Sequence, residues 1–98
     1  IWRSIALVFQ HGTDMEAAKQ IMRKITIADE QVLKFPEPVV RISDVNEKGI
    51  VAKVSYALRY FPDQYDINDR LYPKLESALN PNLVKASSTF YALSSSGV

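Results

Sequence analysis

Cysteine is absent from this 98-residue sequence, and histidine occurs once, as His11. The first absence excludes a disulfide framework, a thiolate metal site and a cysteine nucleophile, and it favours a reducing compartment. Because His11 is the single histidine, it has no second histidine or cysteine with which to bind a metal, and we interpret it as an ordinary loop residue. Gly12 stands alone after the first apolar run, so no glycine-rich phosphate loop is present. We therefore expect no catalytic, metal or cofactor site, and no enzyme.

A strong charge of one sign and a long apolar run are missing as well. Twelve Lys and Arg residues against eleven Asp and Glu give a net charge of +1, which does not favour nucleic acid or an anionic membrane as partner. No apolar run approaches the roughly 18 residues of a membrane span. Strand-like residues begin at Ile1, so we expect a fragment of a longer polypeptide whose other parts can contain such a span. The length itself fits one domain.

The clearest pattern is a β-hairpin from Val39 to Phe61. Apolar residues occupy every second position from Ile50 to Tyr60, which is typical of a strand with one buried face. A preceding run around Val40 alternates in the same way. Asn46 to Gly49 separates the two runs, and Gly49 can take the positive φ that a tight turn requires.

An amphipathic helix is predicted after a first strand between Trp2 and Phe9. The Thr13 hydroxyl and Glu16 have the spacing of a capping box, which places the helix start there. Pro36 and Pro38 restrict the residues before them, so the helix should fade near Leu33. Its expected apolar stripe consists of Met15, Ala18, Ile21, Met22, Ile25 and Ala28.

A second helix is predicted from Asp66 and Asp69, whose negative charges suit a helix N-terminus. With Asp63 these acids are spaced by three, but a calcium loop needs alternate ligands and a turn glycine, so capping explains them better. Pro73 should kink the helix away from the core. The expected stripe consists of Ile67, Leu71, Leu75, Ala78 and Leu79, before a stop at Asn80-Pro81-Asn82.

This element order predicts an α+β fold. Strand, helix, strand, strand, helix is the ferredoxin-like βαββα(β) arrangement, a two-layer sandwich with an antiparallel sheet and two helices on one face. We expect the domain to cover residues 1–80 and a Ser-rich tail to cover residues 81–98. A fourth strand could come from Ser88 to Leu93, or the tail could be disordered or an attachment to something else.

The sheet face opposite the helices is the candidate interaction surface. Apolar residues there, mixed with Arg41, Lys53 and Arg59, fit either a partner subunit or an ordinary solvated face. Stacking aromatics of the kind that bind RNA are missing from the central strands. The candidate subunit-interface residues are Trp2, Val8, Val51, Ala57 and Phe61.

The chain resembles the C-terminal cytoplasmic domain of the small-conductance mechanosensitive channel family, the MscS type. The residues that carry the resemblance lie between Ser4 and Leu79: Ser4 to Phe9, Thr13 to Met22, Glu30 to Leu33 with Pro36 and Pro38, Val39 to Ile42, and Gly49 to Tyr60. The resemblance implies a non-catalytic module of a homo-heptameric cage below a pore, in a protein of the cell (inner) membrane with this domain on the cytoplasmic side. The sequence after Asn80 departs from that family.

A second hypothesis is a stand-alone ferredoxin-like regulatory module that binds a small ligand at a dimer interface. Regulatory amino-acid-binding domains share the topology, but they usually carry an Asp-x-x-Gly turn after the first strand. His11-Gly12-Thr13-Asp14 does not match that turn, so this hypothesis rests on topology alone.

Overall fold

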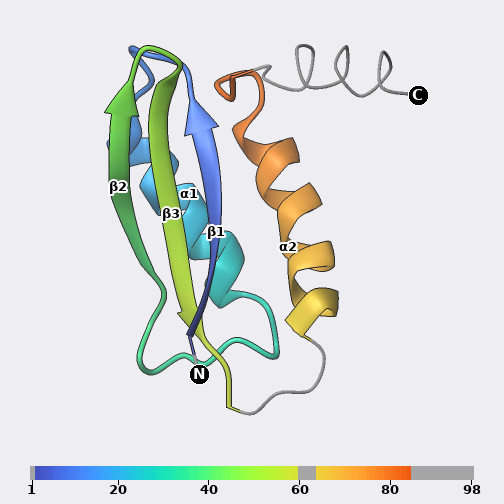
Figure 1. Cartoon of the computed structure of the whole chain (residues 1–98). Coiled ribbons are helices and arrows are strands. Elements are labelled where there is room, and N and C mark those ends of the chain that lie inside the picture. Colours follow the sequence, from blue (N-terminus) through green and yellow to red (C-terminus); the bar gives the residue numbers. More distant parts are fainter. Residues whose placement is uncertain (1, 60–63, 85–98) are drawn as a thin grey trace, which may run out of the picture.

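The chain forms an α+β structure with a three-stranded antiparallel sheet and two helices (Figure 1). The computed structural model describes residues 2–59 and 64–84. Phe61 and the proposed strand from Ser88 to Leu93 lie outside the described residues. The elements in chain order are β1 (Trp2–Phe9), α1 (Met15–Ile27), β2 (Val39–Asn46), β3 (Gly49–Ala57) and α2 (Gln64–Leu79).

β3 is the central strand of the sheet, whose order is β1-β3-β2. It pairs with β1 over the full length of that strand and with β2 through the predicted hairpin, whose turn holds Glu47 and Lys48. The prediction that this strand reaches Tyr60 is wrong, because β3 ends at Ala57. Beyond that point the loop after α1 replaces β2 as partner: the Leu33 N–H donates to the Ala57 carbonyl (2.8 Å), and Val32 bridges Leu58.

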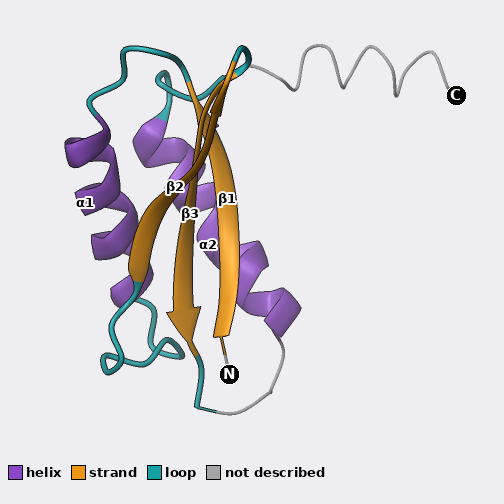
Figure 2. Cartoon of the chain, turned by 60° about the vertical axis from the view of Figure 1, so that its left-hand side comes forward, coloured by secondary structure: helices purple, strands orange, loops and turns teal. Residues whose placement is uncertain are grey.

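One apolar core lies between the sheet and the helices. The alternation predicted for the second run of the hairpin is confirmed, since Ala52, Val54 and Tyr56 of β3 are fully buried. In the first run only Val40 is buried, and Ile42 is 43% exposed. Both helices contribute to the same cluster, so they cover the same face of the sheet, with α1 behind the sheet in Figure 1 and both helices visible in Figure 2. The buried strand and helix residues of this cluster are Ile5, Leu7, Phe9, Val40, Ala52, Val54, Tyr56, Ala18, Met22, Ile67, Leu71, Leu75 and Leu79.

Both ends of α1 differ from the prediction. Asp14 is the N-cap residue and accepts from the Ala17 N–H (3.2 Å), whereas the Thr13 hydroxyl donates to the Gln10 carbonyl (2.6 Å). The capping box that began at Thr13 is therefore wrong by one residue. The helix ends at Ile27, well before Leu33. The chain turns there, with the Asp29 N–H donating to the Thr26 carbonyl and the Gln31 N–H to the Asp29 side chain.

α2 begins two residues before the predicted start and runs through Pro73. Asp69 therefore lies beyond the first turn, and the prediction that it caps the helix is wrong. Pro73 is exposed and lies off the buried stripe, as its position in the predicted helix indicated. Ala78 and Ala28 were placed on the stripes and are instead exposed. None of the helices in the described ranges is long and apolar enough to cross a bilayer.

The packed structure continues past the expected domain boundary at residue 80. Leu83 is 9% exposed, belongs to the core cluster and bridges Phe9 in antiparallel orientation. The Gln10 N–H donates to the Asn82 carbonyl (2.8 Å), and the Val84 N–H donates to the Val8 carbonyl (2.9 Å). The segment after α2 therefore pairs with the end of β1.

Gly49 lies where the hairpin turn closely approaches β1, and this contact predicts how a larger residue would change the stability. Its φ is +152°, and an added Cβ would lie 2.3 Å from the Phe9 carbonyl oxygen. Gly49→Ala should therefore destabilise the fold through both the backbone conformation and the clash, by more than the ~1–3 kcal/mol of strained backbone alone. Urea unfolding followed by circular dichroism measures this loss.

Gly12→Ala is the matched control. Gly12 also has positive φ, +89°, but an added Cβ would meet nothing within 4 Å. Its replacement should therefore show the backbone cost of about 1–2 kcal/mol without a steric component. Equal losses for the two variants would contradict the role assigned to the contact between Gly49 and β1.

Candidate functional site

The sheet face opposite the helices holds most of the described interface candidates. Trp2 is 49% exposed, and Val8 and Val51 are half-buried. Ala57 is only 3% exposed and adds almost no surface to this face. Phe61 lies outside the described residues. The structure therefore brings Trp2, Val8 and Val51 to one face, in agreement with their alternation.

β2 adds Val39, which sequence analysis did not place on the open face, and it supplies Arg41, which was expected there. Val39 is 37% exposed and lies opposite Ser55. Arg41 lies directly opposite Lys53, and both are exposed. Like charges at directly opposed positions of an antiparallel pair are unfavourable. The open face therefore combines apolar side chains with a cation pair that an acidic partner surface would neutralise.

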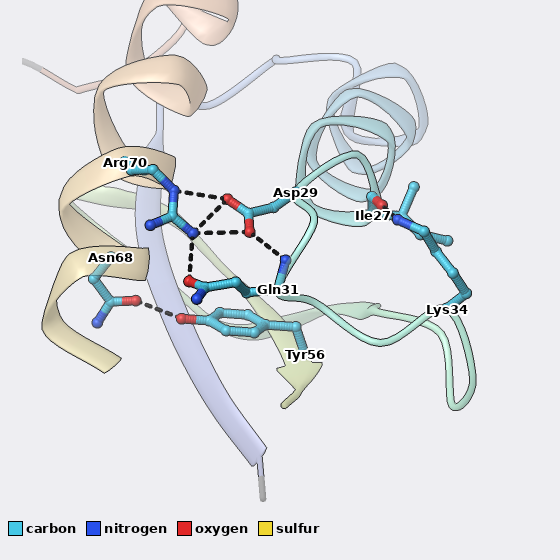
Figure 3. A network of polar contacts seen from close by, with 7 residues as sticks. All are labelled: Ile27, Asp29, Gln31, Lys34, Tyr56, Asn68 and Arg70. Carbon is cyan, nitrogen blue, oxygen red and sulfur yellow. Dashed lines mark hydrogen bonds and ion pairs between the residues drawn. The ribbon is translucent and has the colours of Figure 1, made fainter. Parts of the chain in front are cut away.

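A second cluster of polar side chains links the loop after α1 to α2 (Figure 3). The Asp29 side chain is 3% exposed and accepts three hydrogen bonds from Arg70, at 2.9, 3.1 and 3.2 Å. It also accepts from the Gln31 N–H (3.0 Å), while the Gln31 side-chain oxygen accepts from Arg70 (2.9 Å). A buried carboxylate with this many donors is fully compensated.

The electrostatics of Asp29 indicate a structural role. Burial alone would raise the pKa of Asp29, but the hydrogen bonds from Arg70 and Gln31 and the positive charges of Arg70 and Lys74 outweigh burial and lower it below 3.8. A general base works best with a pKa near the working pH and needs access to a proton. Asp29 has neither property, so the cluster ties the α1–β2 loop to α2.

Tyr56 makes a parallel link from the sheet to α2. Its ring is fully buried, and its hydroxyl donates to the Asn68 side-chain oxygen (2.5 Å; Figure 3). Burial raises the pKa of Tyr56 above 10.0, so the phenol remains protonated and able to donate at neutral pH. α2 is thus tied to β3 by one hydrogen bond and to the loop after α1 by the several hydrogen bonds of Arg70.

A shallow cavity of about 320 Å³ adjoins the Asp29 cluster. Gln31, Lys34 and Arg59 supply its polar lining together with Glu30, and Lys34 also donates to the Ile27 carbonyl. Two cations against one acid make this cavity better suited to a small anion, such as a carboxylate, than to a cation.

The remaining sequence candidates carry no chemistry in the described structure. His11 donates from Nε2 to the Asn46 carbonyl (2.7 Å), which ties the loop after β1 to the hairpin. Among the described residues, no three His, Asp or Glu side chains gather as a metal site would require. Asp63 lies outside the described residues.

Sequence analysis missed both Asp29 and Arg70. They are 41 positions apart, and each looks like an ordinary polar residue in its own segment. The only local signal is that Asp29 directly follows the amphipathic pattern of α1, where a buried acid needs a cationic partner. Which of the twelve cations that would be is a tertiary property.

The Asp29 cluster generates a prediction about acid stability. Asp29→Asn leaves Arg70 without its carboxylate and should cost about 1–3 kcal/mol of unfolding free energy at pH 7. Because the folded pKa is lowered, the contribution of Asp29 is fully present above its unfolded pKa of 3.8. It is lost as the pH falls through the lower folded value. Urea unfolding between pH 7 and pH 2 measures both effects.

Glu16→Gln provides the control, since the side chain of Glu16 is 83% exposed. This variant should keep the acid dependence of the parent chain. The Asn variant at position 29 should lose stability less steeply than the parent below pH 4. The same steepness in both variants would contradict the assignment of acid sensitivity to Asp29.

Comparison with known proteins adds no relative to this description. No family model matches the chain, and no curated protein matches it significantly. Functional assignments for the open sheet face and the cavity therefore rest on geometry, charge and the family resemblance of the sequence.

Proposed function

We propose that the chain is a non-catalytic cytoplasmic domain of a mechanosensitive ion channel of the MscS type, with a ferredoxin-like fold. It contributes to the oligomeric cage below the pore and to ion passage and gating on osmotic stress. The parent protein is a homo-oligomer, a heptamer by the family resemblance, held in the cell membrane by segments upstream of this chain. Nucleic acid has no part in this function.

The arrangement of the elements supports the fold part of the proposal. The order β1-β3-β2 with both helices on one face corresponds to three strands of a ferredoxin-like sheet, in which a fourth strand borders β1. Leu83 already bridges Phe9 at that border. Within residues 2–59 and 64–84, no helix covers the other face of the sheet, which is where a partner could bind.

The open sheet face is the observation that carries the functional part. Val39 is exposed two positions from Arg41, which lies directly opposite Lys53, and the exposed Trp2 lies on the same face opposite Ala57. An apolar surface with uncompensated cations favours a partner that supplies both apolar contacts and acids. A face of this kind presents an assembly surface and needs no catalytic group.

The same chain carries a second exposed patch, an apolar side chain near an acid, which would complement the apolar and basic open face. Phe35 is 86% exposed, the most exposed of the large apolar side chains in the described residues, and the exposed acid Glu37 follows two positions later. Two different complementary patches on one chain produce head-to-tail contacts, which form a ring when the rotation between neighbouring subunits closes. Such contacts influence gating only if they differ between the closed and open states.

Paired substitutions in β2 test the open face as an assembly surface. Val39→Asp places an acid on the open face. Val45→Asp is the control: Val45 is 61% exposed, but it lies opposite Ile50 and points to the helix-side face of the sheet. In the full-length parent, the first should lower the assembled fraction about ten-fold, as expected for an interface change worth ~1.4 kcal/mol. The second should leave assembly unchanged. Mass analysis of the detergent-solubilised protein gives the fraction.

Phe35→Ser extends the test to the complementary loop. Because Phe35 contributes little to the core, its replacement should weaken assembly and leave the unfolding midpoint unchanged. Cell fractionation with an antibody to this domain tests the channel itself. Recovery of the native protein as a soluble species no larger than this 98-residue chain would overturn the proposal.

The cavity beside the Asp29 cluster favours a second candidate function, a stand-alone regulatory module that binds a small ligand at a dimer interface. Lys34, Arg59 and Gln31 would hold a carboxylate there. Calorimetric titration with amino acids should then give heat that Arg59→Glu abolishes. No heat with amino acids or divalent cations would exclude this candidate and leave the channel proposal untouched.

A further inference from the structure

Gln31 belongs both to the polar cluster around Asp29 and to the lining of the shallow cavity beside it. Its side-chain oxygen accepts from the Arg70 guanidinium at 2.9 Å (Figure 3), and its backbone N–H donates to Asp29. Gln31 therefore connects the cavity to α2.

The contact with Arg70 decides which way the Gln31 amide is turned. A guanidinium carries five N–H donors and no acceptor, so only the oxygen of the amide can face it. The amide nitrogen, with its two donor hydrogens, is then turned away from Arg70. No described residue accepts a hydrogen bond from this nitrogen.

The rest of the cavity lining combines donors with apolar surface. Arg59 and Lys34 are exposed there, and the Lys34 ammonium keeps donors to spare after its hydrogen bond to the Ile27 carbonyl. Val32 and Leu58 lie opposite each other in a β-bridge and are 3% and 2% exposed. Such a lining offers hydrogen bonds to an acceptor and contact to a hydrocarbon group.

We propose that Arg70 orients Gln31 so that the amide nitrogen becomes the specificity-determining donor of this cavity, and that the cavity takes a carboxylate with a short apolar chain. The carboxylate accepts from Gln31, Arg59 and Lys34, and its chain covers the apolar lining. The volume of about 320 Å³ is small for a ligand site, which limits the chain to a few carbons. This inference rests on the second candidate function, whose site it uses, and it assigns Arg70 a positioning role there.

Titration of the 98-residue chain with sodium butyrate tests the site, with the Gln31 side-chain amide signals in NMR spectra as the readout. Sodium chloride of equal ionic strength controls for screening. Butyramide is the matched neutral probe, because it replaces one carboxylate oxygen by an NH₂ donor. Butyrate should bind at least about ten-fold more tightly than butyramide, since its hydrogen bonds are charge-assisted.

Substitutions at positions 30 and 31 separate the donor from the charge. Gln31→Glu keeps an oxygen for Arg70 and should preserve the unfolding midpoint, but it should lower the affinity for butyrate at least about ten-fold. Gln31→Met removes the donor without adding a charge and should lower the affinity about three- to ten-fold. Glu30→Gln is the control in the same lining, and it should raise the affinity because it removes a negative charge.

Arg70→Lys tests the positioning role. Lysine keeps a positive charge for Asp29, but it lacks the planar fork that spans two acceptors. The Gln31 side-chain nitrogen should therefore show a lower NMR order parameter than in the parent chain. The affinity for butyrate should fall about two-fold, because roughly half of the amide orientations then present the nitrogen to the cavity.

The outcomes separate this inference from the function on which it rests. No butyrate-dependent shift of the Gln31 signals would overturn both the inference and the second candidate function. Butyrate binding that survives Gln31→Met and Gln31→Glu, or equal affinity for butyramide, would overturn the inference alone. An unchanged order parameter in Arg70→Lys would overturn the positioning role of Arg70. None of these results bears on the channel proposal.

Discussion

The structure depends on the position of β3, which has neighbours on both edges and buries one face. A central strand must pair all its backbone groups, and its buried face must be apolar. Val54 and Tyr56 meet the second requirement, while β1 and β2 meet the first. Once β3 is placed, the helices can cover only the face to which these side chains point.

Polar contacts then fix α2 more narrowly than apolar packing does. The stripe of α2 would allow small rotations with similar burial, because apolar contacts are not directional. Arg70 and Asn68 reach groups on two different segments, Asp29 and the Tyr56 hydroxyl. Both contacts are satisfied in one orientation of α2, so they specify that orientation more than they add net stability.

The sequence predicted the elements whose signals are local, and it failed where the signals are tertiary. Strict alternation located β1 and β3, and the spacing of apolar residues located both helices, because a buried face imposes its own period. The predicted end of α1 was wrong, because the Asp29 side chain accepts the Gln31 N–H two residues on and competes with helix, and because its contact with Arg70 of α2 is tertiary. The same holds for the candidate site, where Val39 became visible only through its register with Ser55.

The edges of the sheet limit how copies of this chain can associate. β2 is protected by its charges and its register irregularity, and β1 has already begun to pair with the chain's own residues at Leu83. Continuous sheets between copies would require a free, flat edge. Association of copies is therefore disfavoured at the β2 edge and at the paired end of β1, whereas the face that contains Trp2 has no helix against it among the described residues. Protection of those edges and exposure of that face are two consequences of one sheet order.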